Sequence, residues 1–221
     1  MKKIPKAWYD FLLELSVNNN REWFEENKPR YLEIKNQTKL FAAHVFGALN
    51  SFDSSLQTPG EKPYLFRIYR DARFAKGKPF KNHFWFLFSQ GGKPMMHQRW
   101  GFYLHIQPWN TFLIAGIWRP EPFLLKNIRK NIDEDSTEIK NILENKKIKK
   151  YFSLRWEQVK TAPKWYKKDN ENIALLRYKE FYLLKNFSDE EVLNENFFDE
   201  IASSAKIGLP LNQYLNKLAV K

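Results

Sequence analysis

The sequence predicts an α+β fold, with a mostly antiparallel sheet of about five strands flanked by N-terminal and C-terminal helices. The first observation is a change of period: apolar residues recur every three or four positions at both ends of the chain and every two positions in its middle. The second is that no repeat, low-complexity tract or linker divides the 221 residues. A single domain over residues 1–221 is therefore expected, long enough to bury a core without disulfides.

Composition narrows the class of protein further. Hydrophobic residues make up 43% and aromatic residues 17% of the chain, with 19 Phe, 10 Tyr and 8 Trp, which predicts an aromatic-rich core. The absence of cysteine excludes disulfides, thiolate metal sites and a cysteine nucleophile. No apolar run reaches the length of a signal peptide or a membrane-spanning helix, so we expect a cytoplasmic protein without a membrane partner.

The chain is strongly basic. Its 37 basic and 25 acidic side chains give a net charge of +12. Such an excess attracts nucleic acids and anionic small molecules from a distance, although a lysine-rich surface also serves solubility alone.

The N-terminal region is expected to be helical. Apolar positions at three- and four-residue spacing predict a helix over residues 6–17. Asn19 with Glu22 resembles a capping box that begins a second helix. Pro29 lacks an N–H donor and must kink or restart that helix, which then continues to about Asn50.

The middle of the chain is expected to form the sheet. Alternating patterns predict strands over residues 64–71, 83–88, 100–107 and 112–118. If the second and third strands pair antiparallel, one face is an apolar core made of Phe84, Phe86, Phe88, Phe102, Leu104 and Ile106. The opposite, polar face then carries His83, Trp85, Tyr103, His105 and Gln107, joined by Arg67 and Tyr69 if the first strand enters the sheet.

Helices return after the fourth strand. The helical period restarts at Phe123, and Ser136 is expected to cap the next helix. Residues 140–168 then hold ten basic side chains against two acidic ones. A run of this kind is usually a solvated face, and it is also the best candidate for a nucleic-acid surface.

The C-terminal part completes the predicted fold. Residues 177–184 are expected to form the last strand. The sequence S-D-E-E from Ser188 is a capping box that opens a helix through about Ala205, and residues 210–218 form a short terminal helix.

The stretch from Phe66 to Phe84 holds the most unusual chemistry of the chain. Its charged members are Arg67, Arg70, Asp71, Arg73, Lys76, Lys78 and Lys81. Guanidinium groups bind phosphate or carboxylate through two parallel hydrogen bonds, so this loop is a candidate anion site. The alternative is a surface loop whose arginines pair with Asp71 and with Glu22 or Glu25.

The sequence lacks the common motifs of catalytic, nucleotide-binding and metal-binding sites. It contains no G-x-S-x-G elbow, no G-x-G-x-x-G motif and no phosphate-binding G-x-x-x-x-G-K-[ST] loop. The four histidines lack the short spacing of metal ligands, so we expect no metal and no cofactor. His105 is the best candidate for proton transfer, although a structural role is the simpler interpretation.

Five motifs together resemble the widespread bacterial family called domain of unknown function 2461. They are N-N-N-R-E-W-F (18–24), F-R-I-Y-R-D-A-R-F (66–74), G-F-Y-L-H-I (101–106), G-I-W-R-P-E (116–121) and L-L-R-Y-K-E-F (175–181). Members of that family usually continue the second motif with K-D-K-T-P-Y-K, whereas this chain has the shorter K-G-K-P-F-K (76–81). The resemblance implies a single-domain cytoplasmic protein and brings no established activity.

The leading hypothesis is a protein that binds an anionic ligand, phosphate-bearing or nucleotide-like, on the polar sheet face and the basic loop. The candidate ligand-binding residues are Arg67, Tyr69, Arg70, Asp71, Arg73, Lys81, His105 and Lys179. One alternative is a nucleic-acid-binding module that uses the basic surface. Another is an enzyme with His105 or Glu121 as general acid or base.

Overall fold

Three helices begin the chain in the computed structural model, which describes residues 3–56, 65–71, 73, 75–154 and 156–219. They are α1 (Lys6–Val17), α2 (Arg21–Glu26) and α3 (Lys28–Asn50). The predicted bounds of the first helix are confirmed. Pro29 lies in the first turn of α3, where its missing N–H would have no helical partner, so the restart predicted there is also confirmed.

The cap of α2 differs from the prediction. Asn20, not Asn19, is the N-cap, and its side chain accepts a hydrogen bond from the backbone N–H of Trp23. Asn19 instead faces a distant part of the chain, where its amide exchanges two 3.0 Å hydrogen bonds with the backbone N–H and C=O of Phe80. A tertiary contact that satisfies two backbone groups therefore takes the residue that the local pattern assigned to the cap.

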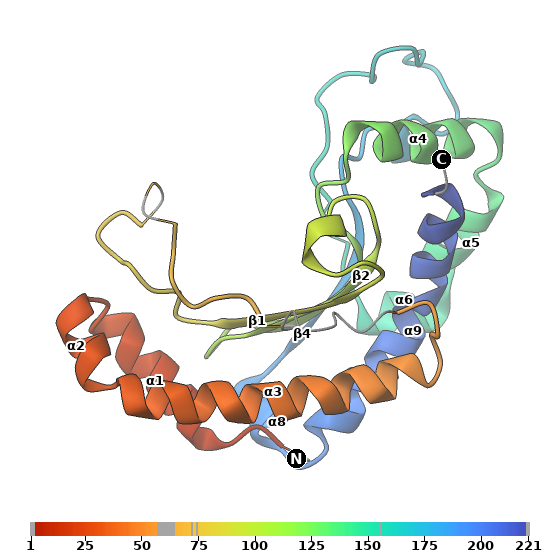
Figure 1. Ribbon diagram of the computed structural model, residues 1–221. Coiled ribbons are helices and arrows are strands. Elements are labelled where there is room, and N and C mark those ends of the chain that lie inside the picture. The colour runs from red at the N-terminus through yellow and green to blue at the C-terminus, as the bar shows by residue number, and fades with distance from the viewer. Residues whose placement is uncertain (1–2, 57–64, 72, 74, 155, 220–221) are drawn as a thin grey trace.

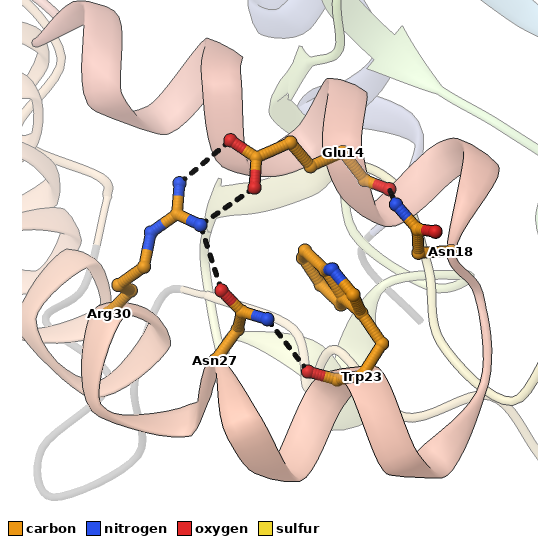
Figure 2. Close-up of polar contacts among 5 residues, drawn as sticks. All are labelled: Glu14, Asn18, Trp23, Asn27 and Arg30. Atoms are coloured by element: carbon orange, nitrogen blue, oxygen red, sulfur yellow. Dashed lines mark hydrogen bonds and ion pairs between the residues drawn. The ribbon is translucent and has the colours of Figure 1, made fainter.

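A polar network fixes the corner between the first three helices (Figure 2). Both terminal nitrogens of Arg30 donate to the carboxylate of Glu14, at 2.7 and 2.9 Å. Arg30 also donates to the Asn27 side chain, which in turn donates to the carbonyl of Trp23. The two-pronged ion pair lowers the pKa of Glu14 and orients α3 relative to α1.

The sheet has four antiparallel strands in sequential order. They are β1 (Phe84–Ser89), β2 (Gly101–Ile106), β3 (Thr111–Ile117) and β4 (Phe181–Phe187). Phe84 lies opposite Ile106 and Phe86 opposite Leu104, which confirms the predicted pairing and the predicted apolar face. The α+β class is likewise confirmed.

The expected number of five strands is wrong. Residues 65–71 form no strand and make two isolated bridges, Leu65 to Phe86 and Tyr69 to Phe80. After its bridge with β1 the segment turns away to pair with its own returning end, where Pro79 has no N–H to donate. The Lys93 ammonium also donates a hydrogen bond to the carbonyl of Leu65, a backbone group that could otherwise pair with a neighbouring strand. The last strand, β4, begins four residues later than the prediction.

Helices α1, α3 and α9 (Phe197–Leu218) cover the apolar face of the sheet. Trp8 of α1 packs edge-on against Phe84, and Phe41 of α3 against Phe86, with ring centroids 5.8 and 5.7 Å apart. In the view of Figure 1, α3 runs below the sheet while the segment after residue 65 rises above it, beside α2. This leaves the second face of the sheet toward the basic segment.

Shorter elements complete the C-terminal half. They are η2 (Lys93–Met95), α4 (Pro122–Glu134), α5 (Thr137–Glu144), α6 (Lys146–Tyr151), α7 (Ile173–Leu176) and α8 (Asp189–Leu193). The capping box at Ser188 is confirmed, but the helix it opens ends at Leu193. The remainder of that predicted helix and the terminal helix predicted over residues 210–218 form one helix, α9, which continues through Pro210 and packs on β3. Within the described part of the chain, no helix is long and apolar enough to cross a membrane.

Candidate functional site

Phe80 anchors the basic segment to the helices. Its ring stacks on that of Phe24 from α2 at a centroid distance of 3.9 Å. Its backbone is held on one side by Asn19, and its carbonyl also accepts a 2.8 Å hydrogen bond from Nε of Arg70. The segment is thereby tied to α2 at one buried residue, with its cations on either side.

Four cations interact with one another beside the basic segment. They are Arg67, Arg70, Lys81 and Lys93, and we call them the cation cluster. The ammonium groups of Lys81 and Lys93 lie 5.8 and 4.6 Å from the centre of the Phe66 ring, a cation–π arrangement. Each also donates to a backbone carbonyl, of Arg67 and Leu65 respectively.

The positive charges of the cation cluster act on one another, and the charge of Arg67 also acts on Asp71, whose carboxylate pairs with Arg73. Burial lowers the pKa of Lys81, and the neighbouring Arg67 and Arg70 lower it further. Burial and then Lys81 lower the pKa of Lys93 in the same way. None of the four forms an ion pair with a described carboxylate. Like charges therefore face one another here, and an incoming anion would relieve that repulsion.

Arg73 and Asp71 form a separate pair. The Arg73 guanidinium donates to both carboxylate oxygens of Asp71, at 3.0 and 2.7 Å. This contact, followed by the Arg73 backbone N–H, lowers the pKa of Asp71. The basic loop was expected to be either an anion site or a surface loop whose arginines pair with acidic side chains. For Arg73 the second interpretation holds, because it pairs with Asp71.

A cleft of about 540 Å³ opens between α3 and residues 65–69, and we call it the basic cleft. The cations that line it are Lys28, Lys35, Lys39, Arg67 and Lys93. No acidic side chain is among its lining residues. Lys28 pairs with Glu25, which lies outside the lining, so the remaining four cations carry the uncompensated charge of the cleft.

Two tyrosines add neutral donors to the basic cleft. Burial raises the pKa of Tyr31 to about 12, and Tyr69 contributes to the rise. The Tyr31 hydroxyl has no hydrogen bond with a described residue, although the ring is packed between Phe11 and Phe24. Tyr69 is 45% exposed at the mouth of the cleft. The Tyr31 phenol remains protonated near neutral pH, and both hydroxyls are of a kind that can donate to an anion.

The polar face of the sheet is an aromatic layer. His105 stacks on Phe112 with ring centroids 4.6 Å apart and lies 4.4 Å from His83. Its Nε2 is 2.9 Å from Oε1 of Gln107, and only 7% of the residue is exposed. Trp85 packs beside both imidazoles. His105 is therefore packed within this layer, and its link to the cation cluster runs through His83.

A family model described as "Conserved hypothetical protein (DUF2461)" matches residues 7–214, which include all four strands, the basic cleft and the cation cluster. The chain belongs to this family. No curated protein and no solved structure matches the chain. The family description states no activity, so the function of this DUF2461 member must be argued from its own residues.

The imidazole pair predicts how the stability of this DUF2461 protein depends on pH. Burial, then the charges of His105, Lys81 and Arg70, lower the pKa of His83 to about 3. Because the unfolded chain takes up that proton near pH 6.5, unfolding is favoured as the pH falls from about 6.5 toward 3, by at most about 1.4 kcal/mol per pH unit. His83→Gln is expected to remove the part of this slope that His83 contributes in urea unfolding at pH 7, 6 and 5, while His105, whose pKa burial also lowers, keeps its own part.

The control for this experiment is His44→Gln, which changes an exposed histidine on α3. Its curve of unfolding free energy against pH should run parallel to that of the wild type. A His83→Gln variant that keeps the full wild-type slope would show that this imidazole is not buried in its neutral form.

The remaining predicted site residues lie in other surroundings. Lys179 pairs with Glu157, beside Arg119 and Glu180. Glu121 precedes α4, and its carboxylate accepts a 2.8 Å hydrogen bond from the Gln98 amide. Of the predicted residues, the structure brings Arg67, Arg70, Tyr69 and Lys81 to the cleft and the cation cluster.

Sequence reasoning missed the contribution of α3 to the cleft. Lys28, Lys35 and Lys39 follow one another by seven and four residues, a spacing that places them on one side of a helix. That signal was present in the sequence. Tyr31 belongs to the same series, three residues after Lys28 and four before Lys35. Lys93 had no comparable signal, because only the packing of η2 brings it there.

Proposed function

We propose that this DUF2461 protein binds an anionic, phosphate-bearing ligand in the basic cleft. The observation that carries the proposal is the cation cluster, of which Arg67 and Lys93 line the cleft and no member forms an ion pair with a described carboxylate. Burial and the neighbouring cations lower the pKa of Lys81 and Lys93. A phosphate group would supply the missing negative charge at a site that is already formed.

The chemistry of the lining favours phosphate over a small monovalent anion. Arg67 offers a fork of N–H groups that matches two phosphate oxygens, and the lysines act as point charges around it. Tyr31 and Tyr69 add hydroxyl donors. The volume of about 540 Å³ suits a molecule of nucleotide size, and Phe66 provides an apolar surface for its body.

The proposal is tested by titrating the protein with inorganic tripolyphosphate. Thermal unfolding measures the gain in stability, and calorimetry measures the affinity. A ligand at one hundred times its Kd should raise the free energy of unfolding by about 2.7 kcal/mol. Arg67→Glu and Lys35→Glu are each expected to weaken binding by tenfold or more, because each reverses a charge that lines the cleft.

The matched control is Lys206→Glu, an equal change of net charge at an exposed position of α9 that does not line the cleft. It should leave the affinity within about twofold of wild type. If Lys206→Glu weakens binding as much as Arg67→Glu does, the attraction belongs to the net charge of the whole chain and the proposed site is wrong.

A further inference from the structure

A second cavity, of about 630 Å³, lies between the start of α4 and residues 164–166. The basic cleft, by contrast, lies between α3 and residues 65–69, and the two share no lining residue. Trp165 and Tyr166 line the second cavity together with prolines and a leucine at the start of α4. Its cations are Lys126, Arg129, Lys130 and Lys164, and no acidic side chain lines it. Lys130 pairs with Glu134, and both Glu134 and Asp133 act on Tyr166 from outside the lining. We call it the Trp165 cavity.

Arg129 places a half-buried charge at this cavity. Its Nε and Nη2 donate to the carbonyls of Leu176 and Tyr178, at 2.8 and 3.1 Å. Nη1 has no hydrogen bond with a described residue, and no described carboxylate forms an ion pair with the group. Burial lowers the pKa of Arg129, and the neighbouring Tyr166 opposes that shift. An anion in the cavity could accept a hydrogen bond from Nη1.

Trp165 supplies the flat apolar surface. The residue is 85% exposed and adopts a φ of 81°, a left-handed conformation that is unfavourable for a bulky side chain. Lys164 lies 4.6 Å from the centre of the indole ring. An exposed indole held in a strained conformation beside the Lys164 ammonium fits stacking against a planar, negatively charged group.

We propose that the Trp165 cavity binds a small planar aromatic anion. Its ring would stack on Trp165, and its carboxylate, sulfonate or phosphate would face Arg129 and Lys164. The volume of the cavity matches a small-molecule site. Its apolar walls suit the aromatic ring of the ligand, and its cations suit the negative charge. This site is independent of the anion binding proposed for the basic cleft.

The test uses anilinonaphthalene sulfonate, an aromatic anion with a planar naphthalene ring, whose fluorescence rises on binding. We expect saturable binding that Trp165→Gly weakens about tenfold, because glycine accepts the positive φ and removes only the ring. Trp109→Gly is the matched control, since Trp109 is also 80% exposed, has a φ of 61° and does not line the cavity. That variant should bind as the wild type does.

The charge requirement is tested in the same assay. Lys164→Glu should weaken binding of the dye about tenfold, whereas Lys168→Glu, an exposed position in the same segment outside the cavity, should leave it unchanged. The neutral dye N-phenylnaphthylamine should bind at least tenfold more weakly than the sulfonate. Equal losses in Trp165→Gly and Trp109→Gly, equal affinity for the neutral dye, or no saturable binding would each overturn the proposal.

Discussion

Gly116→Ala is expected to lower the free energy of unfolding by about 4 kcal/mol or more, which approaches the total stability of many domains. Gly116 lies within β3, opposite Gly101 on one side and Tyr182 on the other, with a φ of 136°. A Cβ built there would lie 2.3 Å from the carbonyl oxygen of Phe181 and 2.6 Å from Cα of Tyr182. Both contacts are to backbone, so the strands would have to separate.

The measurement is urea unfolding followed by circular dichroism. Gly77→Ala is the matched control, because Gly77 also has a positive φ, of 76°, but nothing lies within 4 Å of its added Cβ. It should cost only the backbone strain, about 1–2 kcal/mol. If the two variants lose equal stability, the close approach of β3 and β4 does not constrain position 116.

Phe24→Ala is expected to cost about 3–5 kcal/mol of stability. The ring is fully buried and stacks on Phe80, with Tyr31 and Tyr69 at centroid distances of 5.3 and 5.7 Å. Truncation would therefore leave a cavity in the contact that holds the basic segment to α2. Since both tyrosines line the basic cleft, affinity for tripolyphosphate should fall along with stability.

Phe24→Leu serves as the comparison, because it keeps most of the volume and should cost less than about 1.5 kcal/mol. Unfolding in urea gives the stability, and calorimetry with tripolyphosphate gives the affinity of the folded fraction. A loss below about 1 kcal/mol for Phe24→Ala would contradict the role of this ring as the anchor of the segment.

Much of the fold follows from local patterns. The change of period predicted the order of helices and central strands, and the aromatic alternation predicted that Phe84, Phe86 and Leu104 share one buried face. The S-D-E-E sequence at Ser188 predicted a helix start. These features depend on neighbours within a few residues, and the sequence displays those neighbours directly.

The first predicted strand failed for a reason outside its own residues. Leu65 to Asp71 alternates as a strand should, but its partner is set by which backbone groups are available. Lys93 occupies the carbonyl of Leu65, and Asn19 and Arg70 occupy the backbone groups of Phe80. Side chains from two other segments, together with Arg70 of the segment itself, thus bond backbone groups that the pattern assigned to a ladder.

The candidate site was predicted only in part. An excess of arginine and lysine after Phe66 indicated an anion site, and Arg67, Arg70 and Lys81 do lie together. Binding itself, whether of a small anion or of nucleic acid through residues 140–168, stays a prediction, as does catalysis by His105 or Glu121.

The sequence by itself determined the α+β class, the aromatic core, the basic charge and the membership in the family. Tertiary structure decided which charges are compensated: Arg73 by Asp71 and Lys179 by Glu157, while Arg67 and Lys93 share a cleft with lysines of α3. The physical reason is the separation along the chain between the residues that determine each feature. Periodicity and composition act locally or over the whole chain, whereas the partner of a charge depends on which distant segments pack beside it.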